Sequence, residues 1–147
     1  MALEKSVLTE KSVAELLSRY YGITLASLHK LELGTANCFR VYDGTKFYFL
    51  KEFQSPFAEN MVIQEAKLLE FLSAANIPST NFYKTIQNEF IVYYQNHIIC
   101  LEEYIEGQTY GYDDLPPHLL PLVGQMLGKL HQVLKNYLLL LICLMNG

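Results

Sequence analysis

Two features of the hydrophobic pattern predict an α+β fold built on an antiparallel sheet of about five strands. Apolar residues recur every three or four positions in three segments, and they alternate with polar residues in the segments between. Turn signals such as Asp43-Gly44 join neighbouring extended segments closely enough to form antiparallel hairpins. The 147 residues, of which 51% are hydrophobic, suit one globular domain and exclude a disordered chain.

The first element is a helix predicted to begin after Thr9 and to end at Gly22. Threonine caps helix N-termini, and the apolar residues that follow Thr9 are spaced by three and four. Glycine supplies the left-handed conformation in which helices commonly end. Alternation then predicts two strands, over residues 28–33 and 39–41, joined by a turn of Gly34, Thr35, Ala36 and Asn37.

A third strand, rich in aromatic residues, is predicted over residues 46–53 after the hairpin turn. Pro56 follows a serine, and this pair is typical of a helix N-terminus. The second helix is therefore expected from Pro56 to about Ala75, since the next proline follows closely.

The second half of the chain is predicted to form a meander and then a long helix. Aromatic and β-branched segments at residues 82–86, 90–94 and 97–104 are separated by polar pairs that favour turns. A proline pair at residues 116–117 opens the last helix. Its continuation, residues 137–145, is apolar on all sides, whereas a surface helix needs a polar face.

Composition excludes several classes of function. The net charge of −4 comes without a basic stripe, so no nucleic-acid partner is expected. The longest apolar run is far shorter than the ~20 residues of a transmembrane helix, and no signal-peptide core is visible. Three scattered cysteines (Cys38, Cys100 and Cys143) favour neither a disulfide framework nor a zinc site. We therefore expect a cytoplasmic protein with no transmembrane segment.

Glu65 is a carboxylate at a position that the helical pattern predicts to be buried. Spacing by three and four gives the second helix an inward stripe of Ala58, Val62, Glu65, Leu69 and Leu72. Burying a carboxylate is costly unless a positive group meets it. The alternative leaves Glu65 at a solvated edge, with the stripe rotated to run through Met61, Leu68 and Phe71.

Lys51 is the candidate partner for that carboxylate. Alternation along the third strand places it on one face with Phe47, Phe49 and Phe53. Such a lysine is often an edge residue, or one that extends its amine to water. A strand lysine followed by a helix with an inward glutamate is also the arrangement that orients lysine onto nucleotide phosphates. The pair therefore indicates a phosphate site, with two solvated side chains as the alternative.

Two loops complete this pattern. The turn at residues 34–37 lies between the two strands that precede Lys51, where its backbone N–H groups could cover phosphates. Because it contains one glycine, it is equally an ordinary hairpin turn. The strand that starts at Cys100 ends in polar residues and Gly107, and as a linker it could present backbone groups to a purine. A strand end followed by a turn is the simpler interpretation.

These elements occur in the order seen in a known family. Over roughly residues 12–136 the chain resembles the N-terminal lobe and the start of the C-terminal lobe of the aminoglycoside phosphotransferase and choline kinase family, which has the protein-kinase-like fold. Five motifs carry the resemblance. The phosphate loop resembles Leu33-Gly34-Thr35-Ala36-Asn37, the strand lysine Phe49-Leu50-Lys51, and the ion-pair glutamate of the αC-type helix Gln64-Glu65-Ala66. The hinge resembles Leu101-Glu102-Glu103-Tyr104-Ile105-Glu106-Gly107, and the first C-lobe helix resembles Leu127-Gly128-Lys129-Leu130-His131.

The resemblance implies a role for several residues. Lys51 would hold the phosphates of ATP, Glu65 would orient Lys51, and the loop over the phosphates would be Gly34, Thr35, Ala36 and Asn37. The Glu103 carbonyl and the Ile105 amide would meet the adenine edge, and Mg²⁺ would be needed. The acceptor would be a hydroxyl of an aminoglycoside, a choline-like alcohol or another small metabolite. Residues 1–107 would form the nucleotide-binding lobe, and residues 108–147 would begin the second lobe.

The catalytic loop of that family is not recognised in this sequence. The loop carries His-Gly-Asp followed by asparagine, and a later aspartate binds magnesium. His131 and Asn136 have a similar spacing, but Gln132 and Val133 replace Gly-Asp, and no aspartate follows Asp114. We therefore expect no catalytic residue and no metal ligand here, which fits a truncated lobe that is inactive by itself.

Two other interpretations stay open. The lobe could be a non-catalytic interaction module that associates with itself or a partner through residues 137–145. It could also be an α+β structural protein in which Lys51 and Glu65 are solvated.

Overall fold

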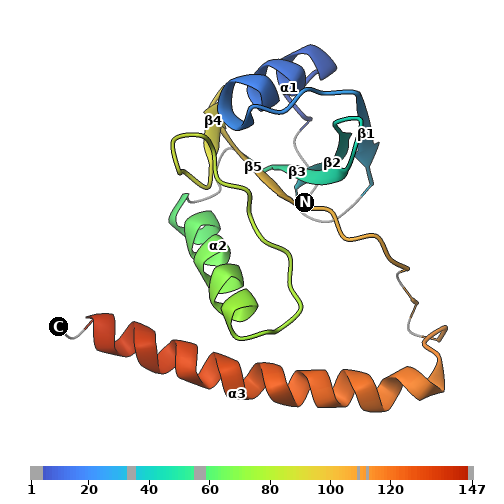
Figure 1. Ribbon diagram of the computed structural model, residues 1–147, viewed down its shortest axis with the longest axis vertical. Coiled ribbons are helices and arrows are strands. Elements are labelled where there is room, and N and C mark those ends of the chain that lie inside the picture. Colours follow the sequence, from blue (N-terminus) through green and yellow to red (C-terminus); the bar gives the residue numbers. More distant parts are fainter. Residues whose placement is uncertain (1–4, 33–35, 55–58, 109, 112, 146–147) are drawn as a thin grey trace.

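A computed structural model shows a five-stranded antiparallel sheet with a helix against each face and a third, long helix set apart (Figure 1). It describes residues 5–32, 36–54, 59–108, 110–111 and 113–145, with side chains followed to residue 138. The strands lie in the order β1-β2-β3-β5-β4. Their bounds are β1 Ser27–Leu31, β2 Asn37–Tyr42, β3 Phe47–Glu52, β4 Val92–Tyr94 and β5 His97–Glu103. The predicted α+β class and its five-stranded antiparallel sheet are confirmed.

The first helix covers one face of this sheet. It consists of α1 (Glu10–Leu16) and a continuing π-helical turn, η1 (Leu17–Tyr21). The Thr9 side chain accepts a hydrogen bond from the Ser12 amide, and Gly22 ends the helix at φ 65°. Both predicted ends are therefore confirmed. The apolar stripe of the helix packs on Tyr48, Leu50 and Leu101, which point to this face from β3 and β5.

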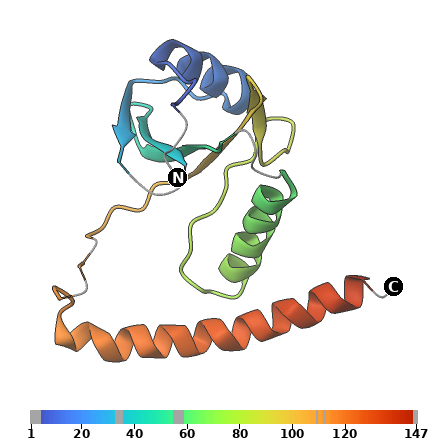
Figure 2. The same cartoon turned by 180° about the vertical axis from the view of Figure 1, so that it is seen from behind.

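The second helix, α2 (Glu59–Ala74), covers the opposite face (Figures 1 and 2). Val62 and Ala66 are fully buried, and they belong to a cluster that includes Cys38 of β2 and Cys100 of β5. The helix ends within a residue of the predicted position. Its predicted start at Pro56 lies outside the described residues.

A buried carboxylate attaches the N-terminal segment to the sheet. Glu52, the last residue of β3, has no exposed surface. One of its oxygens accepts a hydrogen bond from the Ser6 hydroxyl, and the other accepts one from the Val7 amide at 2.9 Å. His97 Nδ1 lies 3.2 Å from the same oxygen that Val7 binds. Three segments of the fold therefore meet at this carboxylate: the N-terminal segment, β3 and β5.

Two local predictions are wrong. Asn37 is not a turn residue but the first residue of β2, where it pairs with Glu52 of β3, because the ladder begins two residues before the strand that the alternation predicts. Residues 82–86 do not form a strand. Phe82 makes a single bridge to Glu102, and the Thr85 hydroxyl then accepts hydrogen bonds from the amides of residues 87 and 89, which closes a turn.

The long helix α3 (Leu120–Met145) follows a 3-10 turn, η2 (Pro117–Leu119), as the proline pair predicted. It touches the rest of the fold near the end of α2, where the rings of Phe71 and Tyr137 lie 4.9 Å apart. Many of its described apolar side chains are exposed. No helix in the described part of the chain is long and apolar enough to span a membrane. The division of the chain at residue 107 stays a prediction.

Candidate functional site

Lys51 lies where the sheet faces α2. It shares this face of β3 with Phe47 and Phe49, as the alternation predicts, and only 20% of its side chain is exposed. Its Nζ atom is 3.3 Å from Glu65 Oε1 on α2 and 2.7 Å from Glu102 Oε1 on β5. The structure therefore brings Lys51 and Glu65 together, and it adds a second carboxylate that is closer.

The position of Glu65 falls between the two predicted helical stripes. Its neighbours Val62 and Ala66 are buried, whereas Met61, on the rotated stripe, is 58% exposed. The helix thus turns its predicted face toward the sheet, but the Glu65 side chain is at the edge of that face and remains 42% exposed. A carboxylate at this edge reaches the lysine amine without being removed from water.

Glu102 is the site residue that the sequence pattern missed as an individual. Its side chain is 4% exposed, and it lies in the penultimate position of β5, directly after the apolar residues 98–101. Antiparallel pairing sets Phe49 opposite Glu102 and Lys51 opposite Cys100, so all four side chains share one face. Because Glu102 follows an apolar run and lies two residues after Cys100, the sequence pattern could have indicated that the two side chains share a face. The pattern could not give the strand register that brings Glu102 beside Lys51.

The Lys51 ammonium lies between two carboxylates, and the pKa values of Lys51 and Glu102 are both raised, for different reasons. Burial lowers the pKa of Lys51, but the hydrogen bond and charge of Glu102, together with the charge of Glu65, raise it above its ordinary value. Burial raises the pKa of Glu102, and the nearby ammonium only partly opposes this. Burial also raises the pKa of the Cys38 and Cys100 thiols, so both stay protonated beside Lys51.

A cleft of about 340 Å³ opens beside Lys51. Its walls are apolar toward β1 and β3 and polar toward the end of β5, a mixture typical of small-molecule sites. The residues that line it are Leu31, Phe49, Lys51, Thr80, Glu102, Glu103, Tyr104, Ile105 and Gly107. The predicted lysine and the predicted hinge therefore border the same space.

The segment after β5 is held at one end and open at the other. The Glu103 amide donates to the Asn81 carbonyl at 2.9 Å, and the Glu103 carboxylate accepts from the Asn81 amide and side chain. Because the N–H and C=O of a strand residue point the same way, the Glu103 carbonyl also faces away from β3. Among the described residues the Ile105 amide has no hydrogen-bond partner, and its side chain is 62% exposed.

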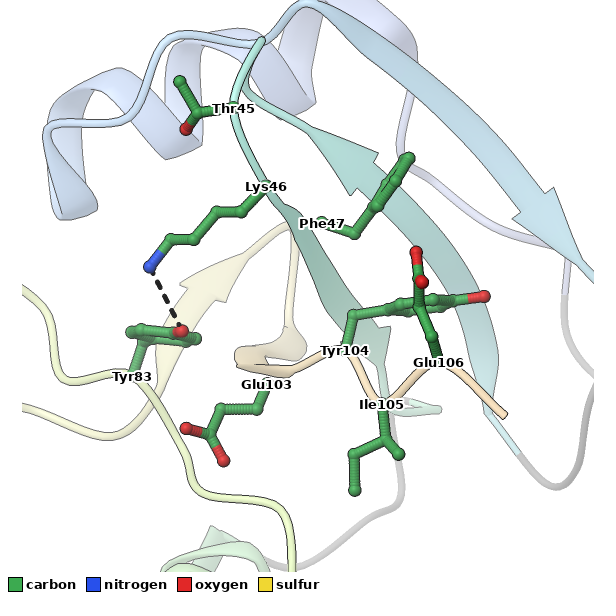
Figure 3. A pocket seen from close by; sticks show the side chains of 8 residues that line it. All are labelled: Thr45, Lys46, Phe47, Tyr83, Glu103, Tyr104, Ile105 and Glu106. Atoms are coloured by element: carbon green, nitrogen blue, oxygen red, sulfur yellow. Dashed lines mark hydrogen bonds between the residues drawn. The ribbon is translucent and has the colours of Figure 1, made fainter. Parts of the chain in front are cut away.

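A second hollow, of about 500 Å³, lies between residues 103–106 and the start of β3 (Figure 3). Lys46 crosses part of it, and its Nζ atom donates to the Tyr83 hydroxyl at 3.3 Å. The same amine lies over the rings of Tyr48 and Tyr83. Sequence reasoning did not anticipate this hollow, because it is formed by side chains from segments that are far apart in the chain.

Part of the predicted phosphate loop lies outside the described residues, namely Gly34 and Thr35. Ala36 is 7% exposed and packs under α2 in the cluster of Cys38 and Cys100. Asn37 is 4% exposed in β2. The described half of the loop thus enters the core.

The described residues do not form a resident Mg²⁺ site. Mg²⁺ binds oxygen ligands in near-octahedral geometry, usually with one or two carboxylates. In the cleft Glu65 and Glu102 both face the Lys51 ammonium, which would repel a dication, and the Glu103 carboxylate is bound by Asn81. Within the described ranges no group of three or more His, Cys, Asp or Glu side chains could hold a metal ion.

Solved structures with a similar fold are small-molecule phosphotransferases and kinases. A spectinomycin phosphotransferase, solved with ADP and spectinomycin, matches with a TM-score of 0.71 at 15% identity over 87% of this chain and 39% of its own. An amicoumacin kinase, solved with AMP-PNP, Ca²⁺ and Ami, matches with a TM-score of 0.73 at 15% identity over 86% of this chain and 40% of its own. A microcompartment-associated aminopropanol kinase matches with a TM-score of 0.64 at 17% identity over 84% of this chain and 40% of its own.

This chain has the fold of a phosphotransferase N-lobe. The chain spans about 40% of the length of these kinase-like neighbours. No protein-family model matches the sequence, and no curated protein matches it either. At identities of 15–17%, the likeness to these structures concerns the fold.

Proposed function

We propose that the chain binds a nucleoside triphosphate in the cleft beside Lys51, as the nucleotide-binding lobe of a small-molecule phosphotransferase. The observation that carries this proposal is the Lys51 ammonium, held by Glu65 and Glu102 at the wall of a cleft whose rim presents the unpaired Ile105 amide. Two neighbours in fold were solved with ADP or AMP-PNP, which supports a nucleotide as the ligand.

Each part of the cleft has a role in this proposal. The ammonium of Lys51 binds the phosphates, and Glu65 keeps it extended across the gap between β3 and α2. The Glu103 carbonyl and the Ile105 amide hydrogen-bond the edge of the adenine ring, and Phe49 and Leu31 cover its faces.

Transfer of the γ-phosphate needs more than this lobe. A metabolite hydroxyl is the acceptor in the proposed reaction, and Mg²⁺ would neutralise the phosphate charge when it is bound. Since the described residues do not form a resident metal site, the ion would enter with the nucleotide. Because the catalytic loop is not recognised in the sequence, we propose that this chain by itself binds nucleotide without transferring phosphate, in the cytoplasm.

Nucleotide binding is tested by the melting temperature of the full chain with and without Mg-ATP. A ligand present at 100 times its Kd adds ~2.7 kcal/mol of stability. We expect this shift in the wild type and its loss in Lys51→Ala. The matched control is Lys67→Ala, which removes an exposed lysine of α2 and should keep the full shift. An unchanged shift in Lys51→Ala, or no shift at saturating Mg-ATP in the wild type, would contradict the proposal. Phosphate transfer by the purified chain, lost in Lys51→Ala, would contradict inactivity.

A non-catalytic interaction module is the second candidate function, and the exposure of α3 favours it. Leu122, Val123 and Leu127 are about half exposed on a helix that touches little else among the described residues. We propose that a second copy of the chain covers this helix, including residues 137–145. Light scattering should give a dimer that dissociates in Leu122→Glu; a monomeric wild type would contradict this candidate.

A further inference from the structure

Lys51 is paired mainly with the carboxylate that the usual lysine–glutamate arrangement does not include. The Glu102 oxygen is 2.7 Å from the ammonium and its side chain is 4% exposed, whereas Glu65 is at 3.3 Å and 42% exposed. Water screens the charge of Glu65 far more than that of Glu102. The electrostatic hold on Lys51 therefore comes chiefly from β5 and not from α2.

The groups around this ammonium leave an excess of negative charge. Glu65 faces it from α2, and Glu102 and Cys100 face it from β5. Cys38 faces it from β2, and burial raises the pKa of both thiols, so neither carries charge. One positive charge therefore stands against two negative charges before any ligand arrives. Phosphates that approach Lys51 would add to an excess that already exists.

We propose that Glu102 competes with the nucleotide phosphates for the Lys51 ammonium, so that the cleft binds a triphosphate tightly only when this carboxyl is neutral or displaced. The inference rests on the proposed function, because it requires phosphates to approach Lys51. Glu102 is then a specificity-determining residue of the cleft. It weakens binding of anionic ligands and leaves the contacts at the adenine edge, made by Glu103 and Ile105, unaffected.

A dependence on pH follows from this competition. Burial already raises the pKa of Glu102, and a phosphate beside Lys51 would raise it further in the complex. A proton is therefore taken up on binding, and affinity for the triphosphate rises as pH falls between the pKa values of the bound and free states. Adenosine carries no phosphate, so its affinity should not change with this titration.

The test compares calorimetric binding of Mg-AMP-PNP and of adenosine by the full chain. Glu102→Gln removes the charge but keeps an oxygen that can accept from Lys51, and Glu102→Leu removes both. Glu65→Gln is the matched comparison, because it neutralises the other carboxylate on the same amine. Far-UV circular dichroism establishes that each variant is folded, and the chain has no tryptophan to report this by fluorescence.

We expect Glu102→Gln to bind Mg-AMP-PNP about tenfold more tightly at neutral pH, because the variant has no carboxylate charge to compete with the phosphates for Lys51. Its affinity should no longer depend on pH, its affinity for adenosine should equal that of the wild type, and Glu65→Gln should give no gain. Equal or weaker binding of Mg-AMP-PNP by both Glu102 variants overturns the inference and leaves the proposed function standing. Failure of all forms to bind either ligand overturns both.

Discussion

Removal of the buried Glu52 carboxylate should destabilise the fold more than any other single charge deletion that we consider. Glu52→Ala leaves the Ser6 hydroxyl and the Val7 amide without their acceptor, and it leaves His97 Nδ1 buried beside an empty space. Each hydrogen bond to a charged group contributes ~1.5–3 kcal/mol. Two such bonds give an expected loss of about 3–6 kcal/mol, close to the ~3–5 kcal/mol for removing one partner of a buried ion pair.

Urea unfolding followed by far-UV circular dichroism measures this loss as a change in the free energy of unfolding. Glu52→Gln keeps one acceptor oxygen and should lose about half as much. Glu32→Ala is the matched control, since it deletes an exposed glutamate just after β1 and should cost less than ~0.5 kcal/mol. A loss below ~1 kcal/mol in Glu52→Ala, or an equal loss in Glu32→Ala, would refute the reasoning that Glu52 anchors the N-terminal segment.

Three further outcomes follow from the structure. Lys51→Met leaves Glu102 buried without its ammonium; we expect up to about 3 kcal/mol less stability at alkaline pH, measured by urea unfolding. This deficit should shrink as pH falls. The pKa of Glu102 is raised in the native state, so the buried carboxyl is neutral below the pKa of the unfolded chain, and stability is lost as pH rises through the native pKa. Gly22→Ala should cost ~1 kcal/mol in thermal melts because the φ of Gly22 is 65°, and this is a backbone cost alone, since the added methyl meets no atom. Gly107→Ala adds a methyl in equally open space at a residue without a positive φ, so it should not change the melting temperature. Hydrogen bonds within its turn hold the pKa of Asp43 well below its ordinary value; wild type should therefore exceed Asp43→Asn in melting temperature at neutral pH, and the gap should close as pH falls below about 4.

Much of the candidate site was accessible from the sequence because it depends on local periodicity. Period two placed Lys51 on one face of its strand, and period 3.6 placed Glu65 on the sheet-facing side of its helix. The two are fourteen positions apart, and a helix that follows its strand directly and packs on the sheet brings such residues together. Their ion pair was therefore a reasonable expectation. The partial exposure of Glu65 was not, because periodicity does not give the rotation of a helix to better than a residue.

The missed features all depend on contacts between distant segments. Asn37, the last residue of the predicted turn, entered β2 because Glu52 of β3 offered it a pairing partner. Residues 82–86 have strand composition, but their edge of the sheet is taken by β4 after a single bridge to Glu102. In both places the backbone conformation was decided by whether a neighbouring strand was available for pairing, and not by the conformational preference of the local sequence.

The sequence by itself determined the class of fold, the ends of the first helix, the face on which Lys51 lies and the excess of apolar residues in α3. These follow from side-chain periodicity and capping, which are properties of neighbours in the chain. Only the tertiary structure decided that Glu102 is the closer partner of Lys51 and that Glu52 holds the N-terminal segment. Both depend on the register of β3 against β5 and β2, and a shift of one residue would turn each carboxylate to the other face of the sheet.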